Sequence, residues 1–134
     1  MSDPAASDPG ISDVVTWSRD RFTVSTDPAR LDLAVIHGYL TRSYWSPGIT
    51  RETVARQIAH SLPFGLYDGG LRDGGLHDRP AQIGFARVVT DRTSFAYLAD
   101  VFVQESHRGQ GLGVFLVGCV TAHPELGDVA ASCW

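Results

Sequence analysis

The stretch that decides the fold is ADVFVQESHRGQGLG, residues 99–113. It consists of an apolar strand, a short polar turn and a glycine-rich segment that begins a helix. A glycine-rich turn at a helix start leaves several backbone N–H groups without partners inside the helix. These groups and the helix dipole favour an anion, typically a phosphate. The stretch therefore predicts an anion site made of backbone N–H groups.

The segments on either side extend this pattern. After the glycines, apolar residues recur at helical spacing until His123-Pro124, which ends the helix. Before residue 99, the segments 81–89 and 94–103 are typical of two strands joined by a turn at 90–93, and we expect an antiparallel hairpin. The second strand is apolar on both faces except for Asp100, which is typical of a central strand covered on both sides.

The N-terminal half predicts one strand followed by two helices. Residues 21–26 alternate as a strand does. Asp27-Pro28 is a helix-start signal for a helix at 31–40, and Thr50 can cap a second helix. A further strand begins at residues 62–67, and residues 128–134 are a candidate last strand. The order predicts an α+β fold with a mainly antiparallel central sheet flanked by helices.

Length and composition indicate one soluble globular domain. The chain has 134 residues, of which 43% are hydrophobic and 19% charged. The Ser-, Asp- and Pro-rich start predicts a disordered tail at residues 1–18, with the domain at 19–134. With no basic or apolar leader and no long apolar run, we expect a cytoplasmic protein.

The charged residues and cysteines exclude several classes of function. A formal net charge of −4 argues against a nucleic-acid or membrane-surface partner. All 11 basic residues are Arg, and without Lys the chain has neither a Walker-type phosphate loop nor a Schiff-base lysine. The chain has only two cysteines, Cys119 and Cys133, which argues against a disulfide framework.

A short repeat, Leu-x-Asp-Gly-Gly, occupies residues 66–78. It has two interpretations, a calcium-binding turn or a duplication that lengthened a loop between strands. Calcium takes six to eight oxygen ligands, more than two or three Asp at this spacing provide. The second interpretation is favoured, and no metal is expected.

Two aromatic residues, Tyr44 and Trp45, lie in a predicted loop before the second helix. In one interpretation they fold back onto the core. In the other they line a substrate pocket, where flat amphipathic rings supply contact area and a polar atom.

The pattern Arg108-x-x-Gly111-x-Gly113, placed after a strand with Val101-x-Val103 and before an amphipathic helix, resembles the GNAT superfamily of N-acetyltransferases. The resemblance covers roughly residues 21–126. It implies the GNAT (acyl-CoA N-acyltransferase) fold and direct transfer of an acetyl group from acetyl-CoA to a primary amine. The acceptor, a small molecule or a peptide, is not identified by the sequence.

The resemblance also assigns a cofactor site. It implies that backbone groups of Val101, Phe102 and Val103 pair with the pantetheine arm of acetyl-CoA. It places the pyrophosphate on a second group of residues, which also supplies a cation: Arg108, Gly109, Gln110, Gly111, Leu112, Gly113 and Val114. In the second interpretation of Tyr44 and Trp45, the pocket that they line is the one for the acceptor amine.

Asp100 is the candidate catalytic residue, either as the general base or as the polar anchor of a base water. Burial on an apolar strand would raise its pKa and suit it to accept a proton near neutral pH. The alternative is that Asp100 only satisfies nearby backbone groups. Glu105 and His107 lie in the turn, and we expect both to be solvated.

The family pattern continues beyond Trp134, so we expect this fold to lack the usual last helix and strands. Three explanations are open: a truncated gene product, a partner that completes the sheet, and a reduced fold that binds acyl-CoA without turnover. The alternative function is therefore a catalytically impaired acyl-CoA-binding or regulatory module, or a remnant of a longer gene. An exposed sheet edge would favour homo-oligomers.

Overall fold

The computed structural model describes residues 14–72 and 79–127. Over these residues the chain forms one five-stranded sheet in the order β2-β3-β4-β5-β6, with every neighbouring pair antiparallel. The strands are β2 (Thr16–Arg19), β3 (Phe22–Ser25), β4 (Leu62–Arg72), β5 (Pro80–Thr90) and β6 (Ala96–Val103). The predicted α+β class and antiparallel sheet are confirmed.

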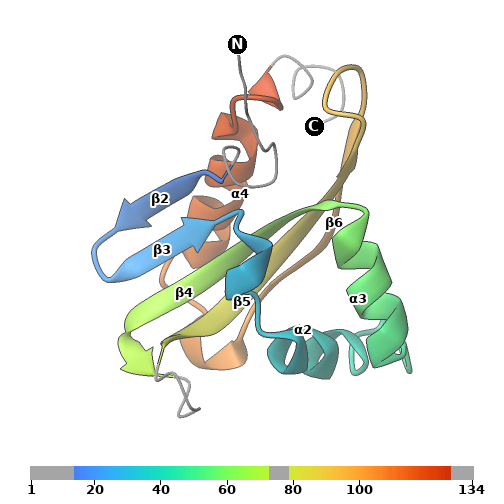
Figure 1. The fold of residues 1–134 in the computed structure, drawn as a ribbon. Coiled ribbons are helices and arrows are strands. Elements are labelled where there is room, and N and C mark those ends of the chain that lie inside the picture. The colour runs from blue at the N-terminus through green and yellow to red at the C-terminus, as the bar shows by residue number, and fades with distance from the viewer. Residues whose placement is uncertain (1–13, 73–78, 128–134) are drawn as a thin grey trace.

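Helices cover both faces of the sheet (Figure 1). The α-helices are α2 (Leu33–Leu40), α3 (Arg51–Ala59) and α4 (Leu112–Ala122), and η1 (Pro28–Arg30) and η2 (Glu105–His107) are short 3-10 turns. One apolar cluster joins α4 to the sheet through Leu116, Phe64 and their neighbours. A second joins α2 and α3 to the opposite face through Ile36, Val54 and Phe102.

The predicted hairpin of β5 and β6 is confirmed, with Phe85 opposite Phe102 and Arg87 opposite Ala99. The register shifts between these two pairs, where Asp100 and Val101 on β6 oppose the single residue Ala86, and the φ of Asp100 is left-handed at 54°. Within the described residues β6 pairs with β5 alone, and the strand predicted at 128–134 lies outside them, so the structure does not test the central position of β6. Helices pack on both of its faces, as its apolar pattern predicts.

The helix starts follow their capping residues. Thr50 accepts a hydrogen bond from the Thr53 N–H and caps α3, as predicted. Asp27 instead caps the separate turn η1, and Asp32 caps α2 by accepting from the Val35 N–H. The first helix is therefore shorter than the predicted 31–40, because a second capping residue follows the first.

Strand β2 lies inside the stretch predicted as a disordered tail, so that prediction is wrong for residues 16–18. Its Trp17 ring stacks on Phe64 at 6.0 Å between centroids, and this apolar contact with the core holds an otherwise polar strand. Strand β4 runs to Arg72, so the first half of the repeat is strand rather than loop. Residues 1–13, 73–78 and 128–134, which include the rest of the tail, the repeat and the last predicted strand, lie outside the described residues.

Across residues 14–72 and 79–127, no helix combines the length and apolar character that a membrane span requires.

Candidate active site

The glycine turn that precedes α4 has the backbone of an open helix start. Gly109 and Gly111 have φ values of 84° and 75°, a left-handed conformation that glycine adopts without a Cβ clash. Gly111 is the N-cap of α4 and supplies no side-chain cap. The first N–H groups of an 11-residue helix are thus left for water or a ligand.

The space above this turn is empty. Apart from the adjoining residues and the backbone of α4 itself, no atom of the described residues lies within 4 Å of where a Cβ would project from Gly109, Gly111 or Gly113. Val114, in the first turn of α4, is 80% exposed. An anionic group can therefore approach the backbone here without displacing a side chain.

An apolar groove of about 670 Å³ runs between β6 and α4, lined by Val101, Gly113, Val114, Val117 and Gly118. Three of these five residues are ones that the sequence assigned to the cofactor. An apolar groove that leads to an uncapped helix start matches the two parts of acetyl-CoA, an extended thioester arm and a pyrophosphate. The residues present therefore fit this molecule.

The remaining predicted cofactor residues have other surroundings. Phe102 and Leu112 are 4% and 1% exposed core residues, so only their backbone groups can reach a ligand. Gln110 is exposed, and its carbonyl accepts a hydrogen bond from Arg19. The Arg108 side chain donates to the Val103 carbonyl at 3.2 Å and to the Tyr39 hydroxyl at 2.7 Å, so its charge lies between the end of β6 and α2.

A second groove, of about 500 Å³, lies on the α2 side of β6 and is called the aromatic groove below. Its lining residues are Tyr39, Arg42, Ser43, Tyr44, Trp45, Gln104, Glu105 and Arg108. Tyr44 is 91% exposed and meets the Trp45 ring edge-on, with 5.2 Å between centroids. Of the two interpretations of this pair, the core one is wrong for Tyr44, which stands at the surface.

Asp100 is joined to the aromatic groove through Trp45, one of its lining residues, and is not an isolated carboxylate. Its Oδ1 accepts from the Trp45 indole N–H at 2.8 Å, and its Oδ2 accepts from the Arg87 Nε at 2.8 Å. Its side chain is 6% exposed. The structure thus brings the predicted catalytic residue to a predicted substrate residue and adds Arg87, which the sequence analysis missed.

His107 is buried, so its prediction as a solvated residue is wrong. It is 6% exposed, its Nε2 lies 2.9 Å from Asp68 Oδ2, and its Nδ1 lies 2.8 Å from the Ser106 hydroxyl. Asp68 on β4 is fully buried and also accepts hydrogen bonds from Arg21 and from the Gly70 N–H. This Asp68 cluster fastens the turn before the glycines to the middle of the sheet. Glu105 is exposed, as predicted.

Burial raises the pKa of the Asp68 carboxyl, but the hydrogen bonds from Gly70, His107 and Arg21 outweigh it. The pKa is held below its ordinary value, so Asp68 is an anion at neutral pH. His107 is therefore bonded to a buried negative charge.

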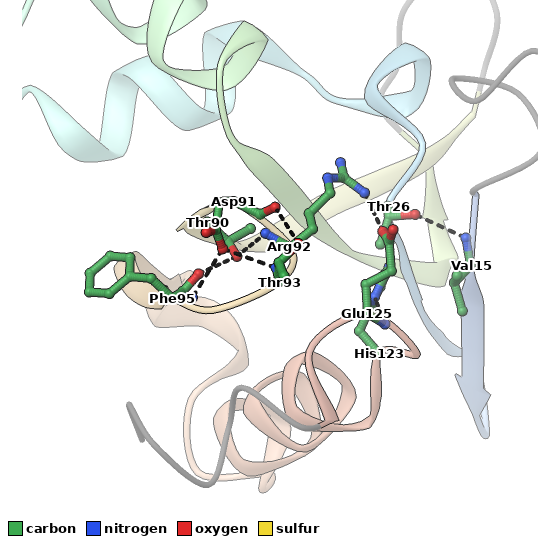
Figure 2. Close-up of polar contacts among 9 residues, drawn as sticks. All are labelled: Val15, Thr26, Thr90, Asp91, Arg92, Thr93, Phe95, His123 and Glu125. Atoms are coloured by element: carbon green, nitrogen blue, oxygen red, sulfur yellow. Dashed lines mark hydrogen bonds and ion pairs between the residues drawn. The ribbon is translucent and has the colours of Figure 1, made fainter.

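The tip of the β5–β6 hairpin is tied to the segment that follows α4 (Figure 2). The Asp91 carboxylate accepts from the backbone N–H groups of Thr93 and Phe95, which closes the turn. The side-chain hydrogen bond from Ser94 is the largest of several that hold the Asp91 pKa well below its ordinary value. Arg92 then forms an ion pair with Glu125. The hairpin that carries β6 is thus joined to the far end of α4.

Where the structure describes the chain, no three His, Cys, Asp or Glu side chains gather as metal ligands would.

The comparisons with known proteins agree with this geometry. The family model described as "Acetyltransferase (GNAT) family" matches residues 40–125 of the chain. A crystal structure of a GNAT-family protein from Xanthomonas campestris pv. campestris is 42% identical, with a TM-score of 0.69 over 78% of this chain and 68% of that one. A structure from Deinococcus radiodurans R1, 23% identical, shares the fold with a TM-score of 0.57 over 86% of this chain and 73% of that one.

A curated protein of Gibberella zeae, named a putative acetyltransferase, is 29% identical over 111 residues. This match covers 75% of the present chain, which spans 63% of the length of that relative. The family match covers more than half of the chain, and the chain belongs to the GNAT family of acetyltransferases.

Proposed function

We propose that this chain is an N-acetyltransferase that moves an acetyl group from acetyl-CoA to a primary amine. The observation that carries the proposal is the uncapped glycine turn at the start of α4, which is open to solvent and follows β6 and the short turn η2. Family membership supports the same activity. Bound acetyl-CoA supplies an acetyl group activated as a thioester, from which the CoA thiolate leaves easily.

The two grooves bind different substrates. Backbone N–H groups of residues 109–114 hold the pyrophosphate, and the groove of Val101, Val114 and Val117 holds the apolar arm. The aromatic groove, with Tyr44 and Trp45, receives the acceptor amine. A backbone N–H on β6 polarises the thioester carbonyl, and by the resemblance this group belongs to Val103.

Acetyl-CoA is expected to stabilise the protein against heat. At 100 times its Kd, a ligand that binds only the folded state adds about 2.7 kcal/mol, which raises the Tm by roughly 8 °C for a domain of this size. Thermal unfolding with and without millimolar acetyl-CoA measures this shift. The appearance of free thiol when an amine is added then reports transfer. An unmoved Tm would contradict the proposal.

A second candidate function is an acyl-CoA-binding module without turnover. It is favoured by one observation, since both carboxylate oxygens of Asp100 already accept hydrogen bonds. The same two measurements separate the candidates, because a binding module gives the Tm shift but releases no thiol with any amine.

For the enzyme, we propose that Asp100 is a polar anchor rather than the base. It holds the Trp45 indole and the Arg87 guanidinium, and a base water would be held by the same group. Asp100→Asn keeps a hydrogen-bond acceptor for Trp45 and loses the charge opposite Arg87. We expect kcat/KM to fall about tenfold, mainly through a higher KM for the amine.

Loss of a general base lowers the rate by about 100-fold to 10,000-fold. A fall of kcat by 100-fold or more in the Asp100→Asn variant, with KM unchanged, would therefore assign the base to Asp100. Steady-state kinetics with the amine varied separate kcat from KM.

Three expectations about location and partners complete the proposal. We propose that the protein acts in the cytoplasm, that it binds neither nucleic acid nor membranes, and that copies associate through the side of β6 that has no neighbour among the described residues. Sedimentation velocity over a range of protein concentrations tests the association.

A further inference from the structure

The aromatic groove is lined by two arginines that form no ion pair with a carboxylate of the described residues. Arg21, Arg87 and Arg92 each form an ion pair. Arg42 and Arg108, which line the groove, form none within residues 14–72 and 79–127. Glu105 is the one acidic residue among the lining residues, so the lining has two basic residues and one acidic residue.

Contacts within the protein already hold the aromatic rings of the groove in place. Tyr39 is stacked flat on Phe102, with 3.9 Å between centroids and 5° between planes, and its hydroxyl accepts from Arg108. Trp45 is held by Asp100. Tyr44 rests edge-on against Trp45 and is otherwise in water. An aromatic ligand would cover these faces without reordering them.

Resting on the proposed function, we infer that the acceptor is a small amine that carries a carboxylate and an aromatic ring, the class of the aromatic amino acids. Arg42 binds the carboxylate, because a planar guanidinium offers two parallel N–H donors to its two oxygens. Tyr44 and Trp45 contact the ring. The amine then lies toward β6, where Asp100 and the Val103 backbone are.

The chemistry balances without a further reactant. The acceptor ammonium loses one proton to solvent, and the amine nitrogen forms an amide bond with the acetyl carbonyl carbon. The bond between that carbon and sulfur breaks. The second proton lost by the nitrogen ends on the CoA thiol.

A matched ligand series tests the inference. Phenylalanine, phenylalanine amide and phenethylamine share the ring and the amine, and only the first carries a carboxylate. Isothermal titration of each into the protein, with and without saturating CoA, gives the Kd, and thiol release with acetyl-CoA gives kcat/KM. We expect phenylalanine to bind at least tenfold more tightly than the other two and to react at least tenfold better.

Two variants locate the effect. Arg42→Gln should reduce the preference for phenylalanine to less than threefold. Arg51→Gln makes the same change at an exposed site in the first turn of α3 and should leave the preference intact. Both sites are exposed, and far-ultraviolet circular dichroism checks that each variant is folded.

The outcomes separate this inference from the proposed function. Equal or tighter binding of the amide or the amine would overturn the acceptor class, as would an unchanged preference in Arg42→Gln, while the acetyl-CoA shift in Tm would stand. If acetyl-CoA fails to bind, the proposed function fails, and titration of the free protein still reports whether the groove selects a carboxylate.

Discussion

Gly111→Glu is expected to weaken acetyl-CoA binding by about 100-fold while the protein stays folded. A glutamate here sets a negative charge beside the N–H groups that would hold the pyrophosphate. At an effective dielectric constant of about 20, two unit charges 4–6 Å apart repel by roughly 3 kcal/mol, which corresponds to about 100-fold in Kd. The added side chain also fills space that is open above the turn.

Gly111 has a φ of 75°, so any side chain strains the backbone, and the control must share that strain. Gly111→Asn adds a neutral side chain of a type that tolerates this conformation, and it should retain more of the affinity. Thr121→Glu adds the same charge in the exposed last turn of α4 and should bind like the parent protein. Calorimetric titration with acetyl-CoA measures all three. Parent-like binding by Gly111→Glu would remove the pyrophosphate from this turn.

Asp68→Asn is expected to lower the free energy of unfolding by about 3 kcal/mol at pH 7, or roughly 10 °C in Tm. The fully buried Asp68 carboxylate bonds to His107, Arg21 and the Gly70 N–H. An amide has a single oxygen and cannot accept from all three, so a buried donor loses its partner. Urea unfolding of the parent and the variant gives the difference.

The pH dependence follows from the lowered pKa of Asp68. The folded protein holds this carboxyl below its ordinary pKa, so the unfolded chain binds the proton more readily. The resulting stability is fully present above the unfolded pKa of about 3.9, and it is lost as the pH falls through the lower folded value. The difference in the free energy of unfolding between the parent protein and Asp68→Asn should therefore become smaller below about pH 4.

Asp20→Asn makes the same change in the exposed β2–β3 turn and should cost little at any pH, because asparagine also tolerates the left-handed φ of 55° found there. If Asp68→Asn unfolds at the same urea concentration as the parent at pH 7, the Asp68 cluster contributes no net stability.

The sequence predicted the features that depend on short-range signals. The cap at Thr50, the β5–β6 hairpin and the helix after the glycines each follow from residues a few positions apart. The glycine turn could be located for the same reason, since its left-handed glycines sit between a strand and a helix. These are the elements that position the proposed cofactor site.

Contacts between residues far apart in the chain could not be predicted from the sequence. His107 looked solvated because its partner, Asp68, is 39 residues away on β4. The two side-chain partners of Asp100 were not predicted, because Arg87 and Trp45 approach it from β5 and from the loop after α2. Strand β2 was missed because its polar residues resemble a tail, and only Trp17 packs on the core.

The bulge at Asp100 also switches the phase of β6. Before it, Ala96 and Leu98 pack on the α4 side of the sheet, and after it Val101 and Val103 do so, while Phe102 turns to the α2 side. Even-numbered residues face α4 before the bulge and odd-numbered ones after it. A strand with unbroken alternation would point Phe102 at α4 and Val101 at α2. Because of the extra residue, β6 contributes to both grooves. Val101 lines the cofactor groove, and Phe102 stacks beneath Tyr39, which lines the aromatic groove.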